Sequence, residues 1–255
     1  MERRALKLRY VGTEFCGWQV QKNGVSVQSV LQDAAEAAFG SRPTVTGCSR
    51  TDAGVHAKGF VCVMDGIPES VPTDRLPDAL NARLPASVVV TAAAKVDPDF
   101  HPRYDAKGKE YRYTVRNRRF PDPFTSDYSV CVPTREPLDA DTLNALCGQF
   151  TGTHDFRSFM ASGSDVEDTV RTVYDFSCTR NGDELIFSVS ADGFLYNMVR
   201  ILVGTVLDLN AGVLKRTPGE ILSACDRAAA GRTMPAKALT LETVFYDPEP
   251  AWEEP

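Results

Sequence analysis

The hydrophobic pattern of the first hundred residues predicts strands and helices in a definite order. Apolar and basic side chains alternate over residues 6–10, which is typical of a strand. Ser26 is expected to cap a helix over residues 27–38, and Gly40 lies just beyond its end. Further strands are expected at 44–48, 60–64 and 88–96 and a short helix at 74–83, so the order is β-α-β-β-α-β.

The second half of the chain repeats this order of elements without repeating the sequence. The segment Arg180-Asn181-Gly182-Asp183 is a strong signal for a hairpin turn between two strands. Thr217, followed by Pro218 and Glu220, is typical of a helix start with a capping box. Strands are expected at 111–115, 170–179, 184–191 and 239–246, and helices at 141–149, 195–210 and 217 to about 229.

Two such units predict an α+β protein built from two ferredoxin-like βαββαβ halves side by side, the second with an added helix. The segment from Asp97 to Pro102 is rich in proline and aspartate and forms the natural boundary. We therefore expect an N-terminal half at 1–100 and a C-terminal half at 101–255. A central cleft between two adjacent sheets would be the default place for a substrate.

Composition excludes several classes of protein. The chain has 255 residues, 43% of them hydrophobic and 24% charged, which is ordinary for a globular protein. It contains no run of about 18 apolar residues, and its start lacks the apolar region of a signal peptide, so we expect a cytoplasmic protein. Seven cysteines without a C-x-x-C pair, and three dispersed histidines, argue against a disulfide framework and a metal site.

The charge is distributed unevenly along the chain. A net charge of −6 counts against a nucleic-acid partner. From Arg103 to Arg119, however, the sequence has seven basic residues and two acidic ones, whereas every charged residue after Tyr246 is acidic. A basic cleft with an acidic exterior would fit this distribution, and so would a charged face exposed to solvent.

The loop Arg50-Thr51-Asp52-Ala53-Gly54 lies between two predicted strands, where functional side chains often project. Arg50 favours the ionised form of Asp52, and an ionised carboxylate can act as a nucleophile or a general base. An alternative is a tight turn in which Asp52 bonds to nearby backbone and Arg50 makes a surface ion pair. Spacing alone favours the alternative.

Other catalytic patterns are missing from the sequence. It has no G-x-S-x-G, no phosphate-binding P-loop and no G-x-G-x-x-G, and the loop offers Asp52 no second carboxylate. Tyr111-Arg112-Tyr113, beside Lys107 and Lys109, suits stacking on unpaired bases and contact with phosphates. A half-buried strand flanked by lysines explains the same residues equally well.

Taken in order, the motifs of this chain resemble those of the TruA-type tRNA pseudouridine synthases over nearly its whole length. The resemblance is strongest at Arg50-Thr51-Asp52-Ala53-Gly54-Val55-His56. The set as a whole is specific, although each piece alone is weak. The other pieces are Tyr10–Gln19, Ser26–Gln28, Phe100–Arg103, Lys109–Tyr113, His154–Phe159, Arg171–Thr172 and Asn197–Gly204.

The resemblance implies a role for each site residue. Asp52 matches the aspartate that attacks the target uridine, and Arg50 matches the arginine that helps to extrude the base. Tyr111 matches the tyrosine that packs against the uracil ring, and Arg200 an arginine that pairs with the aspartate. With Tyr111, two cations of the basic segment, Arg103 and Lys109, are expected to bind the substrate.

The resemblance also implies the reaction and the partners. Uridine at positions 38, 39 and 40 of the tRNA anticodon arm would be isomerised to pseudouridine by a homodimer, without a cofactor or a metal. Ser49 and Ala238 depart from the family, which commonly has glycine at both places. An RNA-binding protein that has lost catalysis is disfavoured because all four matched residues are present. A carboxylate-based hydrolase of nucleosides or sugars is disfavoured by the absent second carboxylate and the basic segment.

Overall fold

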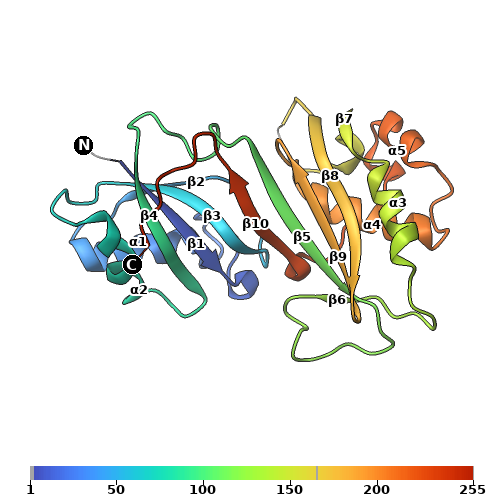
Figure 1. Cartoon of the computed structure of the whole chain (residues 1–255), viewed down its shortest axis with the longest axis horizontal. Coiled ribbons are helices and arrows are strands. Elements are labelled where there is room, and N and C mark those ends of the chain that lie inside the picture. Colours follow the sequence, from blue (N-terminus) through green and yellow to red (C-terminus); the bar gives the residue numbers. More distant parts are fainter. Residues whose placement is uncertain (1–2, 165, 255) are drawn as a thin grey trace. The chain divides into compact units, whose positions relative to one another are not determined.

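The computed structural model describes residues 3–164 and 166–254 and has the expected α+β class (Figure 1). Its contacts divide the chain into two compact units. Unit 1 comprises the described residues up to Lys107 together with those from Thr240 onward, and unit 2 comprises residues 108–239. The division of the chain into halves at residue 100 stays a prediction, since the contacts group the residues differently.

The sheet of unit 1 is built around its first strand. The strand β1 (Arg3–Tyr10) pairs antiparallel with both β3 (His56–Asp65) and β4 (Val88–Val96). The short strand β2 (Thr44–Gly47) pairs antiparallel with β3. Leu6, Leu8 and Tyr10 are buried and Lys7 and Arg9 are not, because a strand points successive side chains to opposite faces. The loop that carries Asp52 therefore joins two paired strands of this sheet.

The last strand of the chain, β10 (Leu239–Phe245), pairs in parallel with β3, and from Thr240 onward it belongs to unit 1. Gly59 of β3 permits the close approach, because a Cβ atom there would lie 2.4 Å from the carbonyl oxygen of Glu242. Lys58 Nζ also lies 3.0 Å from Glu242 Oε1. The hydrophobic pattern predicts this strand but not its pairing with β3, which brings together residues 184 positions apart in sequence at the Lys58–Glu242 pair.

Both ends of the first helix agree with the sequence. The helix α1 (Val27–Phe39) begins at a capping box in which Ser26 and Ser29 exchange hydrogen bonds, and it ends at Gly40 with φ of 79°. The second helix, α2 (Leu76–Asn81), begins later than residue 74 because a 3-10 turn at Thr73–Arg75 comes first. Pro77 lies in its first turn, where a missing N–H is tolerated.

Unit 2 also contains a mainly antiparallel sheet. Its strands lie in the order β5 (Gly108–Arg116), β9 (Glu184–Ala191), β8 (Val170–Asn181) and β7 (Gly152–Asp155). The strand β6 (Val130–Cys131) pairs in parallel with β5. The sequence did not predict β6 and β7, because two and four residues are too few for a period to stand out.

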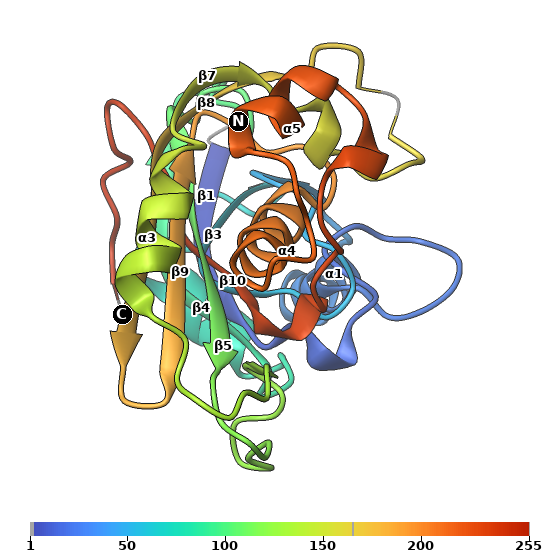
Figure 2. The same ribbon diagram turned by 90° about the vertical axis from the view of Figure 1, so that its right-hand side faces the viewer.

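Helices α3 (Ala140–Gly148) and α4 (Met198–Asn210) pack against each other, α3 also against β8 and α4 against β5 (Figure 2). Ten of the thirteen residues of α4 are buried, which confirms that it is a core helix. The last helix, α5 (Pro218–Ala224), starts at the expected capping box of Thr217. It ends before residue 229 because Cys225 adopts a left-handed backbone, with φ of 46°.

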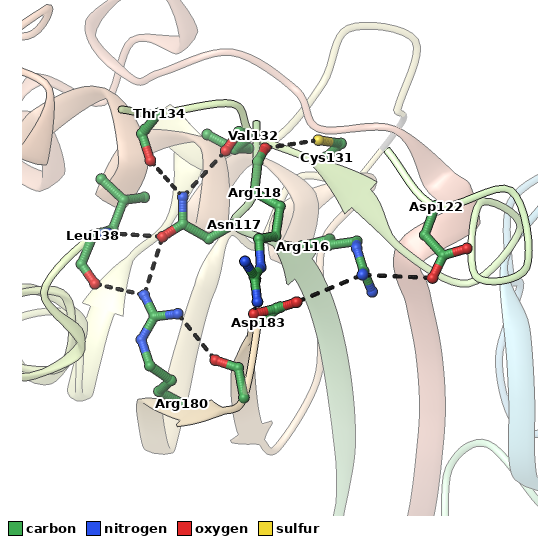
Figure 3. A network of polar contacts seen from close by, with 11 residues as sticks. Arg116, Asn117, Arg118, Asp122, Cys131, Val132, Thr134, Leu138, Arg180 and Asp183 are labelled. Carbon is green, nitrogen blue, oxygen red and sulfur yellow. Dashed lines mark hydrogen bonds and ion pairs between the residues drawn. The ribbon is translucent and has the colours of Figure 1, made fainter. Parts of the chain in front are cut away.

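A polar network fixes the base of the loop that follows β5 (Figure 3). The buried Asn117 donates to Thr134 Oγ1 at 2.8 Å, and its own amide oxygen accepts from Leu138 N at 2.7 Å and from Arg180 Nη2 at 3.0 Å. Beside it, Asp183 pairs with both Arg116 and Arg118. The loop is therefore tied to the β8–β9 hairpin by hydrogen bonds and ion pairs.

We expect Gly204→Ala to destabilise the protein by about 1–3 kcal/mol, the usual cost of overpacking a core. A Cβ atom at this α4 position would lie 1.9 Å from the carbonyl oxygen of Arg232, so the backbone must move. The matched control is Gly219→Ala in α5, where a Cβ atom meets nothing within 4 Å and stability should not fall. Urea unfolding measures both, and equal midpoints for Gly204→Ala and the unsubstituted protein would contradict the packing argument.

Candidate active site

The Asp52 loop (residues 48–55) connects β2 to β3 and is fixed at both ends. Cys48 is buried, and its N–H donates to the carbonyl of Val61 at 2.8 Å. At the other end Val55 N donates to Asp52 O at 3.1 Å, which closes a turn whose Gly54 has φ of 81°. Asp52 is half-buried and Arg50 is exposed. A carboxylate is thus held on a closed turn where a substrate can reach it.

Two buried side-chain hydrogen bonds join the loop to the segment 10–18 that follows β1. The hydroxyl of Tyr10 lies 2.8 Å from Thr51 Oγ1, directly before Asp52 in sequence. The N–H of Gly12 donates to His56 Nδ1 at 3.0 Å. His56 therefore holds the end of the loop.

Backbone also lies directly on backbone between the same two segments. Trp18 N donates to Thr51 O at 3.1 Å, and Gly54 N donates to Phe15 O at 3.3 Å. A Cβ atom at Gly12 would lie 2.0 Å from Val55 O, so only glycine fits there. Gly17 has φ of 100°, a conformation that favours glycine, and a Cβ atom there would lie 2.6 Å from Thr51 O. The motif Tyr10–Gln19 therefore supports the Asp52 loop through backbone hydrogen bonds and direct contact.

In unit 2, the two other principal candidates are Tyr111 and Arg200, and the side chain of each contacts a residue of the segment 194–200. The ring of Phe194 meets Tyr111 of β5 edge to face, with centroids 5.0 Å apart, and Tyr111 is only 6% exposed. Arg200, in the first turn of α4, donates through Nε to Met234 O at 2.6 Å and through Nη1 to Asn197 Oδ1. Tyr111 and Arg200 are therefore each held by this segment.

Asn197 adopts a left-handed backbone, with φ of 62°, at the start of α4. Glycine adopts this conformation most easily, and asparagine tolerates it better than most other residues. Its side chain accepts the hydrogen bond from Arg200. This role of Asn197 was not predicted from the sequence, although the residue opens one of the family motifs, because spacing alone does not show which way an amide points.

Two aromatic side chains of β5, Tyr111 and Tyr113, occupy alternate positions of the strand and are both buried. Tyr113 is fully buried, and its hydroxyl donates to Pro235 O at 2.7 Å. Burial raises the pKa of this hydroxyl, although Arg200 and Arg232 partly oppose the rise, so it stays protonated. The half-buried-strand interpretation is therefore correct for Tyr113. Lys109 on the same strand is 9% exposed.

The remaining candidate lies in unit 1, where Arg103 is exposed in the turn after Pro102. Asp52, Arg50 and Arg103 thus belong to unit 1, and Tyr111, Lys109 and Arg200 to unit 2.

The two departures from the family pattern cause no backbone strain. Among the described residues, the positive φ values outside glycine belong to Asn197 and Cys225. Ser49 and Ala238 therefore adopt ordinary conformations, and Ala238 is buried at the end of the 3-10 turn Ala236–Ala238. Alanine fits this position without needing the freedom of glycine.

Within residues 3–164 and 166–254, no three His, Cys, Asp or Glu side chains gather where they could hold a metal ion. The seven cysteines are free thiols. None of the helices in the described part of the chain has the length and apolarity needed to cross a membrane.

Sequence comparison shows which family the chain belongs to. The sequence model of a family described as tRNA pseudouridine synthase matches residues 8–105 and 146–247, which include the Asp52 loop and Arg200. The chain belongs to this family, which isomerises uridine to pseudouridine.

Similar curated proteins extend over nearly the whole chain. A tRNA pseudouridine synthase A from Halalkalibacterium halodurans is 47% identical over 243 residues, covering 94% of this chain and 90% of that protein. One from Brevibacillus brevis is 44% identical over 249 residues, covering 96% and 100%. The solved Cbf5-Nop10-Gar1 complex aligns with 92% of this chain and 57% of that chain at 11% identity, but its TM-score of 0.38 is too low to support an argument.

We expect Tyr10→Phe and Thr51→Val each to destabilise the protein by about 1–3 kcal/mol, because each removes one side of a buried hydrogen bond. The double variant should be much less destabilised than the sum of the two, since both hydroxyls are then gone. Urea unfolding of the four proteins measures the coupling free energy. Additive losses would show that the hydrogen bond does not join these segments.

Proposed function

We propose that this chain isomerises uridine to pseudouridine at positions 38, 39 and 40 in the anticodon stem-loop of tRNAs, with Asp52 as the nucleophile. Membership of the tRNA pseudouridine synthase family supports the reaction and the tRNA substrate. The assignment to Asp52 rests on the Asp52 loop, in which a half-buried carboxylate lies on a turn that is hydrogen-bonded to the segment 10–18. Such rigidity suits a group that must meet one atom of a substrate.

The proposed reaction rearranges one nucleotide and needs no oxidant or reductant. The bond from uracil N1 to ribose C1′ breaks, the ring turns, and C5 bonds to C1′. C5 gives up its proton to water and N1 takes one up, so the product is an isomer. Asp52 would form a transient bond to the ring at C6 or to the ribose carbon. Arg50, exposed beside it, would help to extrude the target base, a step that costs a few kcal/mol.

Unit 2 supplies the remaining proposed roles. Tyr111, steadied at its edge by Phe194, would pack against the uracil ring and keep the detached base in place. Arg200 would pair with Asp52 and keep its carboxylate ionised, since a nearby cation favours the charged form. The cations Arg103 and Lys109 would contact the RNA.

We also propose the wider organisation that the repeated order of elements suggests. The chain would contain two ferredoxin-like halves side by side, with the RNA bound in a cleft between them, and would act as a homodimer. The cytoplasm is the proposed compartment, because the tRNA substrate and the free thiols fit a reducing environment.

The decisive test uses unmodified tRNA tritiated at C5 of uridine. The unsubstituted protein should release tritium to water, and Asp52→Asn should abolish release while leaving the fold intact. The matched control is Asp33→Asn, which removes an exposed carboxylate of α1 and should leave release unchanged. Binding of tRNA without release by the unsubstituted protein would refute catalysis, and free uracil would indicate a hydrolase.

We expect Asn197→Gly to lower the rate of tritium release about tenfold without loss of stability. Glycine accepts the left-handed backbone but cannot accept the hydrogen bond from Arg200, so the guanidinium is held less firmly. If Arg200 keeps Asp52 ionised, the acidic limb of the pH–rate profile should also move to higher pH. Cys225→Gly, at the other left-handed position, is the control and should change neither. A pH profile identical to that of the unsubstituted protein would contradict the role of Asn197.

A further inference from the structure

A short turn at residues 100–105 of unit 1 exposes an aromatic side chain. Tyr104 is 75% exposed at the tip of this turn, and Arg103 beside it is exposed as well. An exposed ring of this size contributes little to the stability of the fold. Neither the family motifs nor the proposed chemistry gives Tyr104 a task.

The backbone of the 100–105 turn is tied together by its own side chains. Asp105 Oδ2 accepts from His101 N at 2.8 Å, and Asp105 N donates to His101 O at 3.0 Å. The ring nitrogen Nδ1 of His101 accepts from the N–H groups of Arg103 and Tyr104 at 3.1 and 3.3 Å. The backbone N–H groups of residues 101, 103, 104 and 105 thus all donate to acceptors within the turn, and these hydrogen bonds fix its shape.

The same turn is anchored to the rest of unit 1 from both sides. Arg3, which pairs with Asp65, donates to Phe100 O at 2.8 Å. The buried Tyr246 donates through its hydroxyl to Pro102 O at 2.6 Å, and its ring packs against Phe100 with centroids 5.3 Å apart.

The hydroxyl of Tyr246 is a lasting donor for this anchor. Burial raises its pKa, so it stays protonated and keeps donating to Pro102.

The ring of Tyr104 is itself supported by its neighbours. His101 lies against it with centroids 4.2 Å apart and an angle of 32° between the rings, and the guanidinium of Arg103 lies 5.9 Å from its centroid. Most of the ring stays open to solvent. A ring fixed in this way loses little conformational entropy when it binds, and a neighbouring cation suits both a π system and a phosphate.

We propose that Tyr104, with Arg103 beside it, is a stacking platform for an unpaired base of the RNA substrate, separate from the target uridine. Aromatic side chains bind unpaired bases by stacking without regard to sequence, and an adjacent arginine can hold the phosphate. The platform deepens the proposed function and rests on it only in requiring that the chain binds tRNA. It makes Tyr104 a positioning residue that adds affinity, with the chemistry left to the Asp52 loop.

A second exposed aromatic supplies the matched control. Phe124, 92% exposed, lies in the loop after β5 whose base is fixed by the Asn117 network (Figure 3). The arginines at the base of that loop, Arg116 and Arg118, are paired with Asp183. Phe124 therefore offers exposed apolar area, whereas Tyr104 offers a ring that is supported by His101 and lies beside Arg103.

The experiment compares Tyr104→Leu, Tyr104→Phe and Phe124→Leu in the full chain. An anticodon stem-loop RNA is titrated by fluorescence anisotropy, and tritium release gives kcat and KM. Tyr104→Leu should raise Kd and KM about tenfold with kcat and the urea midpoint unchanged, the size expected for one lost stack. Tyr104→Phe keeps the ring and should bind like the unsubstituted protein, as should Phe124→Leu.

A series of stem-loops, each with one abasic nucleotide in the loop, identifies the stacked base. One abasic position should weaken binding to the unsubstituted protein about tenfold and leave binding to Tyr104→Leu unchanged. The platform is overturned if no abasic position does so, if Tyr104→Leu binds normally, if Tyr104→Phe loses as much as Tyr104→Leu, or if kcat falls instead. Absence of tritium release by the unsubstituted protein would refute the proposed function alone, because the RNA titrations still decide the platform.

Discussion

The direct contact between the backbone of segment 10–18 and the Asp52 loop is the constraint on which the candidate site depends. A loop between two strands is normally free to vary, but here its carbonyls lie where any Cβ atom on Gly12 or Gly17 would collide with them. Hydrogen bonds from Tyr10 and to His56 close the same interface with side chains. The position of Asp52 therefore follows from the sheet of unit 1, because β1 leads directly into the segment that supports the loop.

Unit 2 holds its candidate residues by a different physical device. Arg200 is a long side chain with many rotamers, and fixing it has an entropic cost. The structure confines it between the carbonyl of Met234 and the amide of Asn197, which itself adopts a sparsely populated backbone conformation. Local strain at Asn197 is thus coupled to order at Arg200. In unit 1, backbone contacts fix the carboxylate of Asp52, whereas in unit 2 the strained residue Asn197 fixes the guanidinium of Arg200.

Much of the fold could be predicted because its signals are local. Strand alternation, the cap at Ser26 and the capping box at Thr217 depend on neighbouring residues and agree with the structure. The pairing of β10 with β3 and the Tyr10–Thr51 bond join residues far apart in sequence, which periodicity does not address. The family resemblance marked Asp52 and Arg200 but not Asn197 or Tyr104, since the direction of a side chain and the support of a ring arise only from the folded turn.

The discontinuity of unit 1 has a consequence for how the protein is made. Unit 2 occupies one uninterrupted stretch, whereas unit 1 also needs β10, which follows unit 2 in sequence. On the ribosome, unit 2 can therefore be complete while the edge of β3 beside Gly59 still lacks its parallel partner, and an open strand edge is the part of a sheet most prone to wrong association. β3 begins directly after the Asp52 loop. A nascent or truncated chain without β10 thus lacks the finished scaffold around Asp52.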